Sequence, residues 1–275
     1  MKWRLWLAPP CRGDEAMAWD EALFLSEASQ PEGTPVLRFY TWQPSTLSLG
    51  RFQHPEAGLN PGISQGSPLP VVRRTTGGGA IWHDRELTYS LSCHQEHLAV
   101  SGVKASFELL CGFILKTWQA FGWEAGFARD SDPQGRWGAV TAACFAGTEE
   151  YDILVQGKKL GGNAQRRQGK AIFQHGSLPI RLNWDTLRQI FRPEDCPSPE
   201  HVTDLTSQGW LGTPQELAEQ LAEQFCRHLD VVPELWEPGP AEYQQFQKSL
   251  EKYQDPEWTL RGYGAVRDFN HIASP

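Results

Sequence analysis

The residues most capable of chemistry fall in two glycine-containing segments of the chain. The first runs from Arg73 to Ser90 and contains the successive glycines Gly77, Gly78 and Gly79. Glycine lets a backbone approach a ligand closely, and free N–H groups in such a loop can hold an oxyanion or a phosphate. No Gly-Lys-Ser/Thr follows, and the spacing is not Gly-x-Gly-x-x-Gly, so nucleotide-binding fingerprints are absent. Taken alone, the run indicates either a ligand-approach loop or a plain tight turn.

The second segment, Val155–Arg167, places a lysine next to a pair of glycines. Lys159 lies two residues before Gly161 and Gly162, so its ammonium could reach an acyl carbonyl or a phosphate bound against that backbone. A solvated lysine in a hairpin fits the same pattern. The segment therefore predicts a binding role for Lys159 only if a reactive partner lies nearby.

Cys144, in Ala-Ala-Cys-Phe upstream of Lys159, is the candidate nucleophile. A thiolate attacks acyl groups readily, but a lone cysteine is more often a small buried hydrophobic residue. His83 and His175 pair with no nucleophile in the sequence, and we expect both to be satisfied structural residues.

Composition restricts the functional classes further. The net charge of −8 over 275 residues argues against general nucleic-acid binding, although Lys158–Lys170 carries five basic residues and no acidic one. That stretch is either a patch for an anionic partner or a solvated loop. Six scattered cysteines without metal-site spacing, no signal peptide and no apolar run of about 20 residues indicate a reducing cytosol, with no metal and no membrane.

The elements that must position these residues alternate irregularly. Asp14–Ser29 reads as an amphipathic helix capped by Asp14, and Ala105–Phe121 as a helix that ends at Gly122, with Cys111 in its core stripe. Helices are also expected after the capping box at Thr213 and over Pro240–Tyr253. The expected strands are Val36–Tyr40, Thr46–Leu49, Val71–Arg74, Glu86–Ser92, Tyr151–Val155, Lys158–Leu160, Ala171–Phe173 and Ser177–Leu182, with a hairpin turn at Gln156-Gly157. Frequent hairpins favour an α+β fold with a mostly antiparallel sheet, in a single domain over residues 1–275.

Three motifs together resemble the family of lipoate–protein ligases and octanoyltransferases. Arg73–Asp84 reads Arg-Arg-Thr-Thr-Gly-Gly-Gly-Ala-Ile-Trp-His-Asp, Gly157–Gln165 reads Gly-Lys-Lys-Leu-Gly-Gly-Asn-Ala-Gln, and Gln174–Leu178 reads Gln-His-Gly-Ser-Leu. The likeness spans about Met17–Leu229. It implies an α+β fold with a mixed, mostly antiparallel sheet flanked by helices, related to biotin–protein ligase.

The resemblance also implies a set of site residues. Lys159 matches the lysine that contacts the acyl carbonyl, and Gly162–Ala164 is expected to form a turn against the acyl group. The residues expected to bind substrate are Arg74, Thr76, Gly77, Gly78, Gly79, His83, Gly162, Asn163, Ala164 and His175.

Four features bear on the choice between the branches of the family. Cys144-Phe145 followed by Tyr151-Asp152 resembles the cysteine-dependent octanoyltransferases, as does Glu86–Ser90, whereas the loop Gly77–Ala80 is more like that of the ATP-dependent ligases. Gly162-Asn163 also departs from the common Gly-Ser. The transferase branch implies that Cys144 takes octanoyl from acyl carrier protein as a thioester, beside Lys159 as a cation or proton acceptor, without a cofactor.

The acceptor would be a lysine of glycine cleavage H protein or of a lipoyl domain of a 2-oxoacid dehydrogenase. The acidic carriers would meet the Lys158–Lys170 stretch. Three alternatives remain: a lipoate–protein ligase that needs ATP and magnesium, an amidotransferase that moves lipoyl or octanoyl groups between carrier proteins, and a non-catalytic carrier binder.

Overall fold

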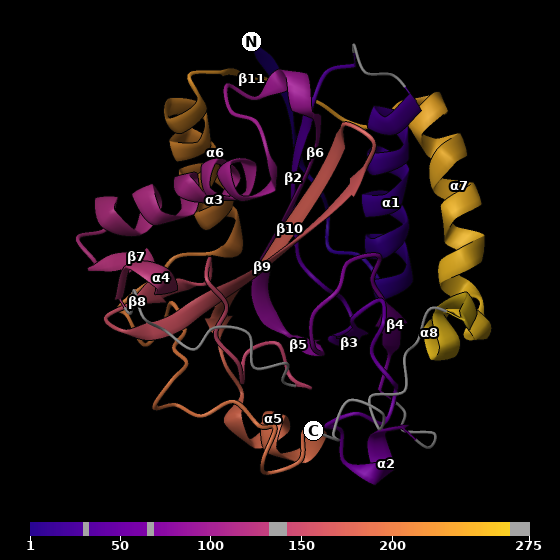
Figure 1. The fold of residues 1–275 in the computed structure, drawn as a ribbon, viewed down its shortest axis with the longest axis vertical. Coiled ribbons are helices and arrows are strands. Elements are labelled where there is room, and N and C mark those ends of the chain that lie inside the picture. The colour runs from indigo at the N-terminus through magenta and orange to yellow at the C-terminus, as the bar shows by residue number, and fades with distance from the viewer. Residues whose placement is uncertain (30–32, 65–68, 132–141, 265–275) are drawn as a thin grey trace.

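The central feature of the fold is a mixed sheet with helices on both faces (Figure 1). The computed structural model describes residues 1–29, 33–64, 69–131 and 142–264. Within them, eight strands are paired in the order β11-β1-β2-β6-β10-β9-β8-β7. These strands are β1 Lys2–Leu7, β2 Val36–Tyr40, β6 Arg85–His94, β7 Ala125–Phe127, β8 Ile153–Val155, β9 Lys158–Gln168, β10 Ala171–Arg181 and β11 Val232–Leu235.

A second, three-stranded sheet carries the glycine-rich loop. It has the order β4-β3-β5, with β3 Thr46–Leu49 parallel to β4 Val71–Arg73 and antiparallel to β5 Ile81–His83. The loop Arg74–Ala80 joins β4 to β5 and therefore lies at one end of this sheet. In the large sheet antiparallel pairs outnumber parallel ones, the small sheet has one of each, and the predicted α+β fold class is confirmed.

The helices form a layer on each side of the large sheet (Figure 1). On one side α1 packs against β6 and β10 and is itself covered by α7, while α3 and α6 pack together on the other side. The helices are α1 Gly13–Ser29, α2 Pro61–Ser64, α3 Val103–Ala120, α4 Ala128–Ser131, α5 Trp184–Ile190, α6 Pro214–Leu229, α7 Pro240–Gln254 and α8 Pro256–Arg261, with short 3-10 turns at Gln95–His97 and Gly262–Gly264.

The predictions for local structure hold where capping or turn chemistry is strong. The Thr213 capping box, the end of α3 before Gly122 and the hairpin at Gln156-Gly157 are all confirmed, with positive φ at Gly122, Gln156 and Gly157. Cys111 is fully buried in the core, as predicted.

Helix α1 differs from the prediction in two respects. It begins at Gly13, so Asp14 lies in the first turn and pairs with Arg12 rather than capping the helix. The helix is also buried on nearly all sides instead of being amphipathic, because the sheet covers one face and α7 covers the other.

Strands β9 and β10 are each longer than predicted. Gly162–Ala164 was expected to be a turn, but it lies inside the continuous strand β9, and the two strands predicted over Ala171–Leu182 are one strand, β10. The glycines here provide space rather than a bend. A Cβ at Gly176 would lie 2.3 Å from Oδ1 of Asn163 and 2.5 Å from the ring of Tyr89.

None of the helices in the described part of the chain is both long enough and apolar enough to span a bilayer.

Candidate active site

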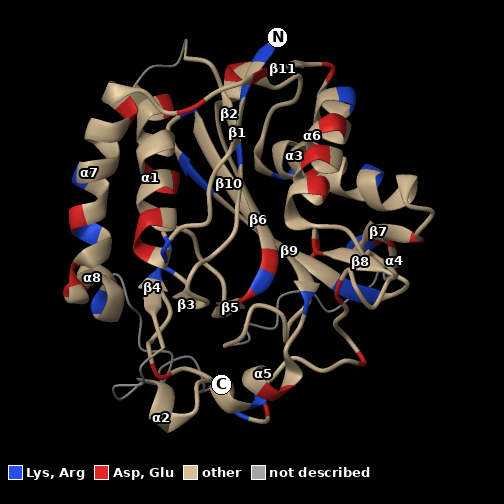
Figure 2. Cartoon of the chain, turned by 180° about the vertical axis from the view of Figure 1, so that it is seen from behind, with Lys and Arg blue, Asp and Glu red and all other residues tan. Residues whose placement is uncertain are grey.

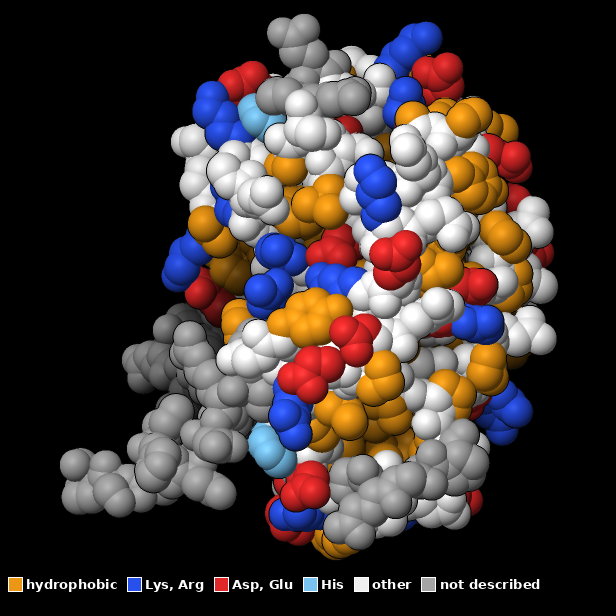
Figure 3. Space-filling view, turned by 90° about the vertical axis from the view of Figure 1, so that its right-hand side faces the viewer, with side chains coloured by type: hydrophobic (Ala, Val, Ile, Leu, Met, Phe, Trp, Pro, Cys, Tyr) orange, Lys and Arg blue, Asp and Glu red, His pale blue; other side chains and the backbone are white. Residues whose placement is uncertain are grey.

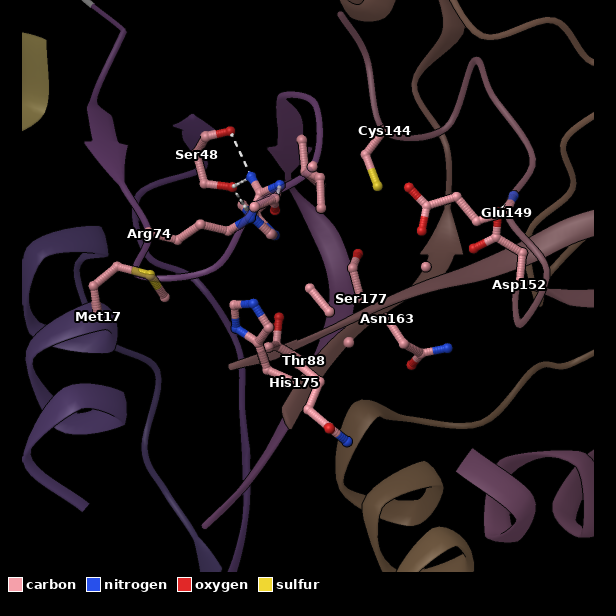
Figure 4. Close-up of a pocket in the computed structure, with 18 of the residues that line it drawn as sticks. Met17, Ser48, Arg74, Thr88, Cys144, Glu149, Asp152, Asn163, His175 and Ser177 are labelled. Atoms are coloured by element: carbon pink, nitrogen blue, oxygen red, sulfur yellow. Dashed lines mark hydrogen bonds between the residues drawn. The ribbon is translucent and has the colours of Figure 1, made fainter. Parts of the chain in front are cut away.

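A cavity of about 330 Å³ lies between α1, the glycine-rich loop and strands β9 and β10 (Figure 4). Its volume is near the lower end of the range for small-molecule sites, about 300 to 1,000 Å³. The structure brings nine of the predicted site residues into its wall: Arg74, Gly77, Gly78, His83, Cys144, Gly162, Asn163, Ala164 and His175. Thr76, Gly79 and Lys159 lie behind that wall.

The cavity wall places Cys144 against the end of the glycine-rich loop. An isolated β-bridge between Ala80 and Ala143 fixes the backbone around Cys144. The N–H of Cys144 donates to the Ala80 carbonyl (3.0 Å), and the N–H of Ala80 donates to the Ala142 carbonyl (2.7 Å). The side chain of Cys144 is partly exposed and its sulfur points into the cavity (Figure 4).

Cys144 and Lys159 meet at Gly162. A Cβ on Gly162 would lie 3.4 Å from Sγ of Cys144 and 4.0 Å from Nζ of Lys159. Lys159 and Gly162 are three residues apart and would face opposite sides of a regular strand. An irregularity in the pairing of β8 with β9, where Leu154 is opposite Lys159 and Ile153 is opposite Gly161, breaks the alternation and brings them to the same side. The absence of a side chain at this position therefore leaves the thiol and the ammonium in one small space.

Lys159 is a buried cation whose hydrogen-bond donors are all in use. Its Nζ lies 2.7 Å from Oδ2 of Asp152, 2.7 Å from the Cys144 carbonyl and 2.9 Å from the Gly147 carbonyl. An ammonium has three N–H donors, so none is left for an acyl carbonyl in this arrangement. Burial lowers the pKa of Lys159, but the neighbouring Cys144 and Asp152 raise it more, so the net shift is upward. These contacts favour Lys159 as a fixed positive charge over Lys159 as a base.

The surroundings of Cys144 favour its protonated thiol over the thiolate. Burial raises its pKa, and Lys159 and Arg74 offset only part of that effect. Arg74 is fixed by bonds from its guanidinium to the carbonyls of Gly77 (2.7 Å) and Gly79 (2.8 Å). The same bonds turn these carbonyls toward Arg74. Because a trans peptide points its N–H opposite to its carbonyl, the N–H of Gly78 faces away from Arg74.

The two predicted histidines have complete sets of partners, as expected for structural residues. His83 bonds through its two nitrogens to Ser48 and Glu86, both at 2.8 Å, and stacks on Trp42 with a centroid distance of 3.9 Å. His175 bonds Thr76 at 2.7 Å and lies 3.6 Å from Asp20. Burial lowers the pKa of His175 although Asp20 opposes the shift. Both rings are thus rigid parts of the cavity wall.

Asn163 presents a hydrogen-bond donor that has no partner among the described residues. Its Oδ1 accepts from the hydroxyl of Tyr89 (2.7 Å), while its Nδ2 is buried and unpaired. The direction of donation along a chain of hydrogen bonds fixes this orientation of the Asn163 amide. Arg167 can only donate, so Gln165 turns its oxygen toward Arg167, and each later group in the chain Gln165, Gln174, Tyr89 and Asn163 donates to the next. The last N–H of this chain therefore remains available to a ligand with an oxygen acceptor.

The basic residues of Lys158–Lys170 do not form the single patch that the sequence suggested. They are spread along β9, which is 11 residues long. Lys159 is buried, Arg166 and Arg167 lie on opposite faces of the strand, and Lys170 pairs with Glu96 beyond its end. Figure 2 shows Lys and Arg distributed over several elements instead.

Two acidic residues of the cavity, Glu149 and Asp152, were not among the predicted site residues. Asp152 had a sequence signal, the aromatic-acidic pair Tyr151-Asp152. Glu149 had none, because a turn brings it to the cavity: its N–H donates to Asp152 Oδ2 (2.7 Å), and the Asp152 N–H donates back to its carbonyl (3.0 Å). Among the described residues, no group of three or more His, Cys, Asp or Glu is placed to hold a metal ion.

A cysteine near a buried lysine at a mostly apolar cavity is an arrangement that suits acyl transfer through a thiol. The family follows from comparison. Residues 12–226 match the family model described as the lipoyl protein ligase A/B catalytic domain, and the chain belongs to this family.

Two relatives show how far the similarity extends. The chain is 34% identical to the octanoyltransferase LipM of Kyrpidia tusciae, over 89% of this chain and 93% of the relative. It is 32% identical to the octanoyltransferase LipM of Bacillus cereus, over 94% and 98%. The predicted family and the predicted acyltransferase class are confirmed.

Solved structures agree on the fold. A lipoate–protein ligase A bound with ATP superimposes with a TM-score of 0.80 at 23% identity, and a putative lipoate protein ligase from T. acidophilum with bound lipoic acid with 0.79 at 22%. Each comparison covers 94% of this chain and 99% of the other.

Proposed function

We propose that this chain is a cysteine octanoyltransferase of lipoate biosynthesis, with residues 1–275 as one catalytic domain. The observation that carries the proposal is the meeting of Cys144 and Lys159 over Gly162 at the wall of the cavity. A ligase that activates its substrate with ATP needs no nucleophilic thiol at this position. The octanoyltransferase names of the relatives favour the same choice.

The reaction we propose has two half-reactions. Sγ of Cys144 attacks the thioester carbonyl of octanoyl–acyl carrier protein, and the carrier leaves as a thiol. A lysine amine of glycine cleavage H protein or of a lipoyl domain then attacks the acyl-enzyme and restores the free thiol. The N–H of Gly78 and the Nδ2–H of Asn163 are the donors we assign to the carbonyl oxygen. Neither half-reaction needs a cofactor, because a thioester is converted first to a thioester and then to an amide.

The compartment we propose is the cytosol. All six cysteines are free, and the mechanism depends on one of them as a thiol, which a reducing compartment preserves.

The function is tested by supplying two donors to the same acceptor. With octanoyl–acyl carrier protein and no ATP, H protein should gain an octanoyl group at its lysine, detected by intact mass. Free octanoate or lipoate with ATP and magnesium should leave H protein unmodified. The reverse pattern would identify a ligase. Transfer only from octanoylated H protein to a lipoyl domain would identify an amidotransferase. The absence of transfer in every arm would indicate a non-catalytic carrier binder.

For the acidic carriers we propose a docking cluster formed by Arg51, Arg166 and Lys252 with the single carboxylate of Glu21. Nζ of Lys252 lies 2.6 Å from Oε1 of Glu21, and Arg166 lies 3.7 Å from the same atom. Burial lowers the pKa values of Arg166 and Lys252, and the neighbouring Arg51 lowers them further. Arg166 and Lys252 therefore share one carboxylate, and the Arg51 cation is near enough to act on both. Figure 3 shows several Lys and Arg side chains near one another on the face that carries α7 and α8, with Asp and Glu side chains beside them.

This docking cluster lies beside the glycine-rich loop that lines the cavity. Arg166 bonds the hydroxyl of Thr75, and the N–H of Arg51 donates to the Thr76 carbonyl (2.8 Å). A carrier bound there would deliver its acyl arm close to Gly77 and Gly78.

Reversing one charge of the docking cluster should slow the encounter with the donor carrier. We expect Arg51→Glu to lower kcat/KM for octanoyl–acyl carrier protein about 5- to 10-fold at low salt, with the deficit shrinking as salt screens the charges. Arg227→Glu is the matched control, since Arg227 is an exposed arginine of α6 on the other side of the sheet (Figure 1). An equal loss in both variants, or a loss that salt does not change, would contradict docking at this cluster.

A further inference from the structure

The two half-reactions place opposite electrostatic demands on one cavity. A thiolate is stabilised by nearby positive charge, and Lys159 and Arg74 supply it. The second substrate, however, arrives as a lysine ammonium, because a lysine side chain with an ordinary pKa near 10.4 is protonated at neutral pH. Once Cys144 is acylated its charge is gone, and the cations that served the first step repel the second substrate.

The carboxylate of Glu149 is placed where it can attract the lysine ammonium of the second substrate. This carboxylate lines the cavity and points toward the sulfur of Cys144 (Figure 4). The carboxylate is close enough to raise the pKa of Cys144, which burial raises most, and to add to the pKa of Lys159. Asp152 is engaged in its ion pair with Lys159, whereas Glu149 is exposed and its carboxylate has no hydrogen bond or ion pair among the described residues.

The position of Glu149 is fixed through its backbone. The reciprocal bonds between Glu149 and Asp152 close a turn, and Asp152 is in turn held by Lys159. The turn therefore holds the exposed Glu149 at the cavity, with its carboxylate toward the sulfur of Cys144 (Figure 4). An amine that reaches an acyl group on this sulfur therefore arrives close to a negative charge.

We propose that Glu149 receives the acceptor lysine for the second half-reaction. This inference rests on the proposed function. The carboxylate binds the ammonium, which loses one proton through Glu149 to solvent as its nitrogen forms the C–N bond. The C–S bond breaks, and the second proton of the nitrogen is transferred to the sulfur. The products are the amide, the free thiol of Cys144 and one proton released to water, so atoms and charge balance.

In Glu149→Gln the rates of the two half-reactions should respond differently, with only the second slowed. Acylation of the enzyme by octanoyl–acyl carrier protein should keep its rate or rise about 2-fold near neutral pH, because a charge that disfavours the thiolate is removed. Discharge of the isolated acyl-enzyme by H protein should fall about 10-fold. Glu149→Asp should recover part of the second rate. Quenched-flow mixing with intact-mass detection measures each half-reaction separately.

Glu150→Gln is the matched control. Glu150 is the adjacent glutamate, it pairs with Lys104 at 2.9 Å, and it does not line the cavity. Both half-reactions of this variant should stay within about 2-fold of the unmodified enzyme, since an exposed ion pair contributes little.

A binding measurement separates failure of this inference from failure of the proposed function. H protein with its lysine intact should bind the unmodified enzyme several-fold more tightly than H protein in which that lysine is methionine, and Glu149→Gln should abolish the difference. If the enzyme forms no acyl adduct, the proposed function fails, but this binding difference still reports on Glu149. Equal slowing of both half-reactions in Glu149→Gln, no slowing of the second, or an unchanged lysine preference would overturn the assignment.

Discussion

Replacing Cys144 by serine should reduce octanoyl transfer at least about 1,000-fold and remove the acyl-enzyme. A serine hydroxyl is far less acidic than a thiol, and the described groups around it cannot ionise it: His83 and His175 are fully bonded and Lys159 is held as a cation. The nearby carboxylate of Glu149 is too weak a base to ionise a hydroxyl. The nearby positive charges of Lys159 and Arg74 can stabilise a thiolate but cannot make an alkoxide accessible near neutral pH. Steady-state transfer to H protein measures the loss.

The matched control for this substitution is Cys196→Ser. Cys196 is also partly exposed, but it does not line the cavity. Its replacement should leave transfer within about 2-fold, as is usual for a change away from the site. If Cys144→Ser retained a tenth or more of the activity, the covalent mechanism would be wrong.

Removing the charge of Lys159 should affect both reactivity and stability. In Lys159→Met the pKa of Cys144 should rise beyond its already raised value, because burial still raises it and the larger of two opposing cations is gone. A higher pKa means less thiolate at any pH below it, so alkylation by iodoacetamide near pH 7.5 should slow about 10- to 1,000-fold. The pH midpoint of alkylation should shift upward correspondingly, by about 1 to 3 pH units.

Stability should fall in the same variant because Asp152 is left buried without its partner. An ion pair broken from one side costs about 3–5 kcal/mol, and the Asp152 side chain is 6% exposed. The double variant Lys159→Met/Asp152→Asn separates the two effects. It removes the stranded carboxylate, so its unfolding midpoint in denaturant should recover toward that of the unmodified protein.

The alkylation profile of the double variant should lie between those of the other two proteins. Asp152 raises the pKa of Cys144, but by less than Lys159 lowers it, so removing both still leaves a net upward shift. An unchanged profile in Lys159→Met would mean that Lys159 has only a packing role.

The local elements that the sequence predicted correctly are those with their own chemical signals. The helix after Thr213 has a reciprocal capping box, and the helix before Gly122 combines an apolar period with a left-handed terminal glycine. The strands around Gln156-Gly157 were clear because a tight hairpin turn needs these residue types. What the sequence could not show is which strands pair. The separation of β3, β4 and β5 into their own sheet depends on partners far apart in the chain.

The glycines were the main source of error. Gly162 was attributed to a turn and Gly176 was left between two predicted strands, but both lie within long strands. Gly162 leaves room for the Cys144 and Lys159 side chains, and Gly176 for those of Asn163 and Tyr89. A sequence records that a side chain is absent, but it does not distinguish a bend from a space that a distant residue fills.

The site itself was predicted in part. The meeting of Cys144 with Lys159 agrees with the family motifs, and nine predicted residues line one cavity. The partners of Lys159 could not be foreseen, because two of its three acceptors are backbone carbonyls of the loop that carries the nucleophile. Glu149 could not be foreseen either, since only the turn with Asp152 brings it to the cavity.

The most direct measurement mixes the unmodified protein with octanoyl–acyl carrier protein in the absence of ATP, stops the reaction in acid, and locates any adduct by intact mass and peptide mapping. A single octanoyl group on the peptide that contains Cys144, discharged when H protein is added, is the predicted result. Acceptor modification with no acyl-enzyme at any time point, or an adduct on a residue other than Cys144, would contradict it.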